Sequence, residues 1–199
     1  ASQPTPKAGT GHDPLPSWND GPVKRAILRF VAAATDPESP GFVPAADRLA
    51  VFDLDGTLWV ERPTYVDLLF AEDRARFLIA GDPSIADNPP YADLVALDDG
   101  RRAALTDDDV LGLVLQSFAG MTPEEYHARA VEFLETARNP LLDRRWVACT
   151  YVPMLELLRF LDANGFATAI ASAGDGDFVR AHALPVFGIP RARAIGTSC

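Results

Sequence analysis

A short apolar run that ends in two carboxylates constrains the fold of this chain more than any other segment. Leu49 to Phe52 are apolar without a break and lead directly into Asp53-Leu54-Asp55-Gly56-Thr57. Such a run is typical of a strand buried on both faces of a parallel sheet. Residues i and i+2 of an extended chain point to the same side, so Asp53 and Asp55 are predicted to face one crevice at the end of this strand, where ligands of open α/β sheets bind.

These residue types favour a particular chemistry. Two neighbouring carboxylates repel each other, and a cation between them and a substrate relieves that repulsion. Oxygen ligands suit Mg²⁺, which keeps several waters and bridges to phosphate groups. Gly56 lets the chain leave the strand sharply, and Thr57 offers a hydroxyl group. A cap or turn is the alternative role for two nearby aspartates.

Apolar periodicity outlines the rest of the chain. We expect further strands at 166–172 and 192–196, and helices at 22–34, 65–79, 106–118, 123–138, 153–164 and 177–183. The helix that begins at Pro123 carries a capping box, Thr122-Pro123-Glu124-Glu125. This order predicts an α/β fold, with a Rossmann-like parallel sheet core formed by 21–58 and 147–199 and an inserted helical cap formed by 59–146.

Composition excludes several classes of protein. The 199 residues carry a net charge of −10, which disfavours binding to nucleic acid or to an anionic membrane surface. No apolar run is long enough to span a membrane. Two cysteines, Cys149 and Cys199, exclude a disulfide-rich scaffold and leave open whether they pair. Residues 1–20 are rich in Pro and Gly and predict a flexible tail, either that of an exported protein after signal-peptide removal or a segment boundary.

Asp53-Leu54-Asp55-Gly56-Thr57-Leu58 resembles motif I of the haloacid dehalogenase superfamily, D-x-D-G-T-[LV]. The apolar segment that ends at Ser172 resembles motif II of that family, a strand that ends in Ser or Thr, and its continuation through Arg180 is similar to phosphoserine-phosphatase-like members. The helical stretch between the two motifs lies where that family carries its C1 cap. The resemblance covers about 48–180.

The resemblance implies a phosphohydrolase that acts on a small phosphorylated metabolite. Asp53 would be the nucleophile that forms an aspartyl-phosphate, and Asp55 the general acid and base. Mg²⁺ would bind the Asp53 carboxylate and the Asp55 carbonyl oxygen. Ser172 would donate a hydrogen bond to a phosphoryl oxygen. Thr57, and the backbone at Ala173 and Gly174 before the next helix, would assist.

Two expected features of the family have no clear counterpart. These are motif III, a Lys or Arg, and motif IV, an acidic pair on a later strand; the lysines Lys7 and Lys24 both precede motif I. One reading is a fragment or a truncated chain. In another, Arg180, Arg191 or Arg193 replaces motif III and Asp175 or Asp177 completes the metal site, although the two aspartates are also suited to capping a helix.

The cap would select the substrate. Glu61 lies near the position where phosphoserine-phosphatase-like members carry a glutamate close to the substrate amine. Arg62, Trp59 and Tyr65 are further candidates nearby, although aromatic residues at such a hinge more often pack. The sequence therefore predicts a Mg²⁺-dependent phosphomonoesterase. Its alternatives are a catalytically impaired protein that binds phosphate or a partner without turnover, and a structural module whose acidic loop is incidental.

Overall fold

The computed structural model describes residues 13–88, 91–96 and 99–197, which divide into two compact units. The helical unit contains residues 13–48 and Val152–Phe166, and the sheet unit contains Leu49–Tyr151 and residues 167–197. This division differs from the expected core and cap, because the helical insertion and the strands belong to the same compact unit.

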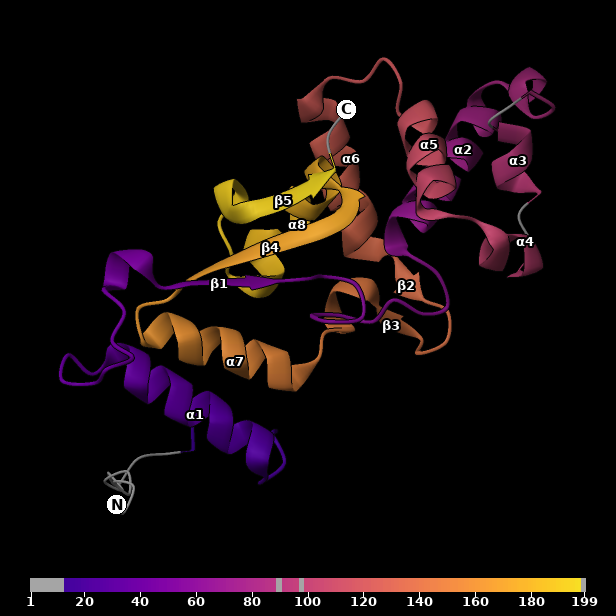
Figure 1. Ribbon diagram of the computed structural model, residues 1–199. Coiled ribbons are helices and arrows are strands. Elements are labelled where there is room, and N and C mark those ends of the chain that lie inside the picture. The colour runs from indigo at the N-terminus through magenta and orange to yellow at the C-terminus, as the bar shows by residue number, and fades with distance from the viewer. Residues whose placement is uncertain (1–12, 89–90, 97–98, 198–199) are drawn as a thin grey trace. The chain divides into compact units, whose positions relative to one another are not determined.

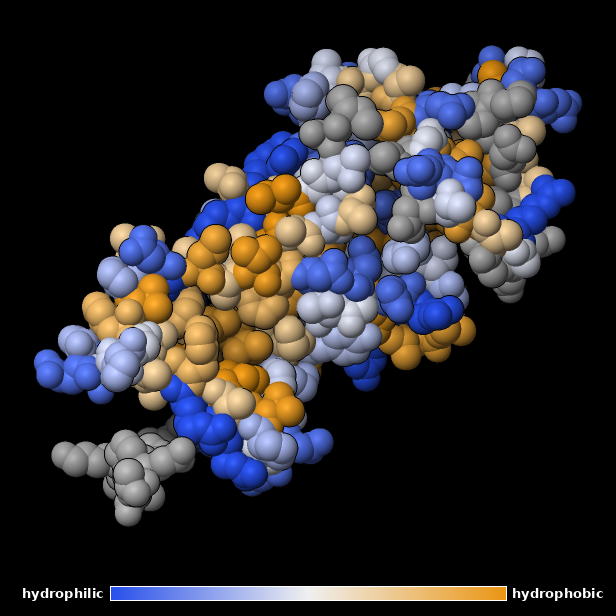
Figure 2. Space-filling view, viewed as in Figure 1, coloured by the Kyte–Doolittle hydropathy of each residue, from blue (hydrophilic) through white to orange (hydrophobic). Residues whose placement is uncertain are grey.

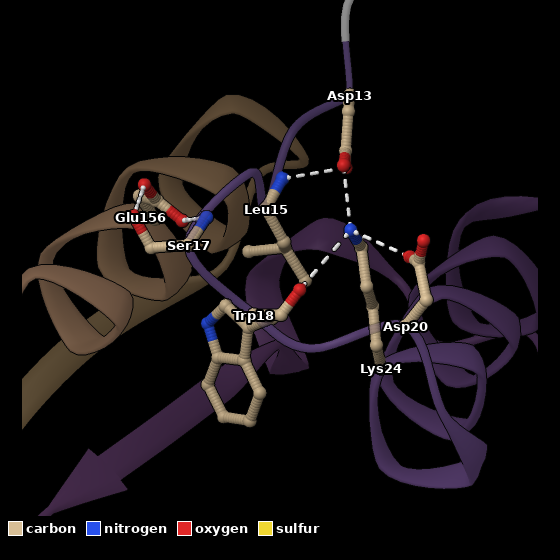
Figure 3. A network of polar contacts seen from close by, with 7 residues as sticks. All are labelled: Asp13, Leu15, Ser17, Trp18, Asp20, Lys24 and Glu156. Carbon is tan, nitrogen blue, oxygen red and sulfur yellow. Dashed lines mark hydrogen bonds and ion pairs between the residues drawn. The ribbon is translucent and has the colours of Figure 1, made fainter.

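The helical unit consists of α1 (Pro22–Thr35), a 3₁₀ turn (Ala45–Asp47) and α7 (Val152–Ala163). The segment before α1 packs within this unit. The indole nitrogen of Trp18 donates to the Pro153 carbonyl oxygen over 2.8 Å, and both the amide and the hydroxyl of Ser17 donate to the Glu156 carboxylate. Leu15 is completely buried. Figure 3 shows Leu15, Ser17 and Trp18 before α1, with Ser17 beside Glu156 of α7.

Lys24 anchors the same segment through charge. Its ammonium group pairs with the carboxylates of Asp13 and Asp20 (Figure 3), although only 6% of the residue is exposed. The hydrogen bond to Asp13 raises the pKa of Lys24. The prediction of a flexible tail over 1–20 is therefore wrong for 13–20, because buried apolar groups and an ion-pair network hold these residues. Residues 1–12 lie outside the described residues.

The sheet unit is built on three parallel strands in the order β1 (Leu49–Phe52), β4 (Ala167–Asp175) and β5 (Ala194–Thr197) (Figure 1). Phe52 pairs with Ile170, and Ile170 pairs with Ala194. The predicted parallel sheet and α/β class are confirmed. Because Asp53 follows Phe52 directly, this register brings the end of β1 beside the segment of β4 that contains Ser172.

One expectation about this sheet is wrong, since β1 is not buried on both faces. Leu49 and Val51 are 60% and 54% exposed, and Ile195 of β5 is 57% exposed. These three residues alternate with more buried neighbours along their strands, as side chains of one face do. Figure 2 shows apolar residues gathered over the three strands on the face turned toward the viewer.

The insertion between β1 and β4 is helical, with α2 (Val66–Gly81), α3 (Tyr91–Val95), α4 (Asp99–Ala104), α5 (Asp107–Ser117) and α6 (Pro123–Thr136). Two short antiparallel strands, β2 (Arg138–Asn139) and β3 (Arg144–Arg145), follow, and 3₁₀ turns lie at Pro83–Ile85 and Trp146–Ala148. The predicted capping box at Thr122 and Glu125 is present, and Thr106 and Asp109 form another at α5. Sequence periodicity did not predict α3 and α4.

Aromatic packing explains why the insertion is not a separate body. The ring of Phe70 on α2 lies 4.4 Å from that of Phe118 and 5.3 Å from that of Phe178, which belongs to α8 (Gly176–Phe187). These centroid distances are those of packed aromatic pairs. Glu72 of α2 is also buried, because this helix is covered on several sides.

A 3₁₀ turn (Arg191–Arg193) connects α8 to β5. None of the helices in the described ranges is long and apolar enough to cross a membrane. Cys149 is buried. Cys199 lies outside the described residues, and the pairing of the two cysteines therefore lies outside them as well.

Candidate functional site

A pocket of about 220 Å³ lies at the carboxyl ends of β1 and β4. It brings together Asp53, Asp55 and Ser172, three residues singled out from distant parts of the sequence. The lining also contains the predicted residues Glu61, Ala173, Gly174 and Asp175 together with Tyr65, Asp67 and Val114.

The turn after β1 positions Asp53. Gly56 adopts a left-handed conformation, with φ of 72°, and its amide donates to the Trp59 carbonyl oxygen over 2.9 Å. A side chain there would meet the Glu61 carboxylate, with Oε2 only 3.0 Å from an added Cβ. The chain therefore turns back directly after the strand. Asp53 is left exposed in the pocket, and its carboxylate accepts a hydrogen bond of 3.1 Å from the Thr57 hydroxyl.

Asp55 has a different environment from Asp53. The indole N–H of Trp59 donates to its Oδ1 over 2.8 Å. Burial raises the pKa of Asp55 to about 7, and the negative charges of Asp67, Asp53 and Glu61 act in the same direction, while the Trp59 hydrogen bond opposes them. Asp55 can therefore exchange a proton near neutral pH, whereas Asp53 stands in a more solvated position.

Aromatic packing fixes the indole that contacts Asp55. Trp59 is completely buried and stacks on His182 of α8, with ring centroids 4.3 Å apart and planes inclined by 20°. Phe187 meets the indole edge-on at 5.9 Å. Burial lowers the pKa of His182 to about 3, so this imidazole is neutral near pH 7. Trp59 packs as the sequence predicts, and the hydrogen bond to Asp55 is an additional role.

The second wall of the pocket is the end of β4. The hydroxyl of Ser172 accepts a hydrogen bond of 3.1 Å from the Gly174 amide, and the Thr197 hydroxyl donates to the Ala173 carbonyl oxygen over 2.7 Å. Asp175 caps α8, since its carboxylate accepts a 2.7 Å hydrogen bond from the Phe178 amide. Asp175 therefore serves the helix-capping role recognised as an alternative, while it also lines the pocket.

The charge of the pocket fits a bound cation. Five carboxylate residues line it, and no Lys or Arg of the described part of the chain does (Asp53, Asp55, Glu61, Asp67, Asp175). Their mutual repulsion contributes to the raised pKa of Asp55. Within residues 13–88, 91–96 and 99–197, no three His, Cys, Asp or Glu side chains converge closely enough to hold a metal ion by themselves. Mg²⁺ keeps several waters and requires only one or two carboxylates.

The predicted substitutes for motif III do not line this pocket. Arg180 donates to Asp177 over 3.1 Å and lines a neighbouring hollow instead. Arg191 also pairs with Asp177, at 3.3 Å, and contacts His127 Nδ1. The Asp177 carboxylate thus forms ion pairs with two guanidinium groups. The sequence-predicted roles of Arg180 at the phosphate and of Asp177 at the metal gain no support from these contacts.

Sequence reasoning missed two of the lining residues. Asp67 lies in the first turn of α2, and its carboxylate oxygen would be 3.2 Å from a Cβ added at Gly174. Val114 of α5 also lines the pocket. Both residues belong to helices that pack near the end of β4. This packing is a tertiary contact, and no local sequence pattern predicts it. The position of Asp67 shortly after motif I was the one available signal.

A scan against protein-family models found no match for this chain, and a search of curated proteins found no match either.

Proposed function

We propose that the chain is a Mg²⁺-dependent phosphomonoesterase of the haloacid dehalogenase type that acts on a small phosphorylated substrate. We further infer that the sheet is part of a Rossmann-like core, for which the helical insertion acts as a cap. One observation carries the proposal: the pocket at the ends of β1 and β4 is lined by Asp53, Asp55 and Ser172, which the two sequence motifs select independently.

In the proposed reaction, a carboxylate oxygen of Asp53 attacks phosphorus, and the bond from phosphorus to the ester oxygen breaks. The carboxyl group of Asp55 gives its proton to the departing alkoxide. A water molecule then attacks phosphorus of the phosphoaspartate, and Asp55, now ionised, accepts a proton from that water. The bond from phosphorus to the Asp53 oxygen breaks, which releases inorganic phosphate and restores the Asp53 carboxylate. The pKa of Asp55, raised to about 7, supports this role because a general acid must be protonated before the first step.

Other groups of the pocket would bind the phosphate. The Ser172 hydroxyl, whose oxygen already accepts from the Gly174 amide, retains its proton for a phosphoryl oxygen. The Asp53 carboxylate and the Asp55 carbonyl oxygen would hold the cation, for which the excess of carboxylates provides the negative field. Bound there, Mg²⁺ would neutralise charge that develops on the phosphoryl oxygens.

Phosphate release from p-nitrophenyl phosphate with MgCl₂ tests the proposal. Asp53→Asn should abolish turnover, because an amide oxygen is a poor nucleophile toward phosphorus. The matched control is Asp162→Asn, which alters an exposed carboxylate of α7 and should retain wild-type activity. Equal activity of the wild type and Asp53→Asn would refute the assigned nucleophile.

The absence of a lining Lys or Arg among the described residues favours a second candidate, a protein that binds phosphate without turnover. Thermal unfolding with Mg²⁺ and beryllofluoride distinguishes the cases, since a ligand of the native state raises Tm. A rise without turnover identifies the binding protein. No rise and no turnover would contradict both candidates and favour a structural module.

A further inference from the structure

A second hollow, of about 190 Å³, adjoins the pocket at the ends of β1 and β4, which we call the phosphate pocket. The two share Val114 and Asp175. The second hollow belongs entirely to the sheet unit. Its walls come from α5 and the turn after it, from the start of α6, from the ends of β4 and β5, and from the first turns of α8 (Val114, Leu115, Phe118, Met121, Thr122, Pro123, Tyr126, Asp175, Asp177, Arg180, Thr197). The shared residues make the two spaces neighbours along one continuous lining.

The wall provided by the insertion is apolar. Leu115 is 39% exposed, while Val114 and Phe118 are almost fully buried. The Phe118 ring packs 4.4 Å from Phe70 and 4.9 Å from Tyr126, so neighbouring rings hold this wall in place. Apolar surface that faces a hollow gains free energy when an apolar group replaces water there.

The opposite wall carries charges of both signs, from Asp175, Asp177 and Arg180. Asp177 pairs with Arg180 and also with Arg191, which does not line the hollow. The Asp175 carboxylate caps α8 by accepting from the Phe178 amide. Unlike the phosphate pocket, where the lining charges are all negative, each carboxylate of this hollow already has a partner within the protein.

We propose that this hollow is the subsite for the alcohol portion of the substrate, and that the preferred substrates are phosphomonoesters of neutral, apolar alcohols. The inference rests on the proposed function, because a phosphoryl group in the first pocket is what directs the ester substituent toward the second. Under this proposal Leu115 and Met121 select the alcohol portion of the substrate, although they have no part in the chemistry of Asp53 and Asp55.

Alkylphosphonates test the subsite without requiring turnover. Calorimetric titration of the wild-type chain in MgCl₂ with ethyl-, butyl- and hexylphosphonic acid should show Kd falling by about threefold to fourfold per methylene while the hollow fills. The same Kd for all three would overturn the inference. Tighter binding of 3-aminopropylphosphonic acid than of butylphosphonic acid would also overturn it, since the hollow would then prefer a charged group.

A substitution assigns the effect to this hollow. Leu115→Asp should reduce the ratio of ethyl to butyl Kd toward one, because it places a charge in the apolar wall. Leu141→Asp is the control, since Leu141 is 68% exposed and does not line the hollow, and should keep the wild-type ratio. If Leu115→Asp does not fold, Leu115→Ser replaces it. An unchanged ratio in the Leu115 variant overturns the inference.

These outcomes separate the two proposals. Binding of ethylphosphonate without any dependence on chain length rejects the subsite and leaves the phosphatase proposal standing. If no phosphonate binds in MgCl₂, and p-nitrophenyl phosphate is not hydrolysed, both the subsite and the proposed function fail.

Discussion

The contact between Trp59 and Asp55 joins a buried aromatic residue to the carboxylate that we propose as the general acid and base. The indole donates one hydrogen bond of 2.8 Å to the carboxylate and is itself held by the stacked ring of His182. The hydrogen bond favours the ionised carboxylate, while burial favours the protonated one. Trp59 is therefore a positioning residue that sets both the orientation and the proton affinity of Asp55.

Trp59→Phe keeps an aromatic ring but removes this donor. We expect a larger loss of kcat on phenyl phosphate than on p-nitrophenyl phosphate, because the poorer leaving group depends more on protonation by a correctly oriented acid. The loss should be about tenfold or more on phenyl phosphate. Steady-state kinetics on both esters measure it. An equal decrease on the two substrates would indicate general damage to the fold and reject the positioning role.

Asp55 should also make the stability of the metal-free chain depend on pH. Its pKa is about 7 in the folded chain against 3.8 as the ordinary value, so the folded state holds this proton more tightly. Its contribution to stability is greatest below pH 3.8, falls as pH rises toward 7, and is lost above pH 7.

Asp55→Asn removes this titration. The Tm of Asp55→Asn relative to wild type in EDTA should therefore rise steadily between pH 4.5 and pH 7.5. Comparing the two proteins at each pH removes the contributions of carboxylates common to both. A constant difference for Asp55→Asn would mean that this carboxylate is not buried as described.

At the scale of the elements, the close approach of β5 to the start of α8 shapes the site. A Cβ added at Gly196 would lie 2.6 Å from the Gly174 carbonyl oxygen and 2.6 Å from the Gly176 Cα, distances that no real contact allows. Both neighbours are backbone atoms of the segment that carries Asp175. Strand β5 can reach its partner only because position 196 has no side chain.

Gly196→Ala should therefore cost about 2 kcal/mol or more of unfolding free energy, as overpacking against backbone does, and should weaken phosphate-analogue binding as well. Gly112→Ala is the control. Gly112 lies inside α5 with nothing within 4 Å of an added Cβ, so alanine there should stabilise the chain by about 0.5–1 kcal/mol. Urea unfolding of both variants provides the test, and equal stability would contradict the described approach of β5.

Local patterns predicted the parts of this fold that depend on local chemistry. The capping box at Thr122 gave the start of α6, and the apolar runs before Asp53 and up to Ser172 gave two paired strands. The exposure of Leu49 was not predictable, because a continuous apolar run does not reveal how many faces of a sheet are covered. Asp67 was missed at the site for a similar reason, since its position depends on how α2 packs.

For the molecule as a whole, each compact unit is held by its own contacts. In the helical unit, Leu15, Trp18 and Lys24 tie the segment before α1 to α1 and α7. Leu15→Ala should cost about 2–5 kcal/mol, as deletion of a fully buried leucine does. Hydrogen exchange should accelerate in peptides from 22–35 and 152–163.

Leu184→Ala serves as the control, because Leu184 is 59% exposed on α8. It should leave exchange near the wild-type rate in both units. If Leu15→Ala left exchange of α1 and α7 unchanged, the segment 13–20 would not be the anchor that its contacts indicate.

The pairing of β1 with β4 has a consequence for the order of events during folding. The two strands flank the whole helical insertion in the sequence, and their register sets the end of β1, which Asp53 follows, beside the end of β4. Closing so long a loop is slow, and a slip by one residue would turn the side chains of a strand to the other face. Any activity of this chain should therefore return late in refolding, after most of the helical signal has recovered.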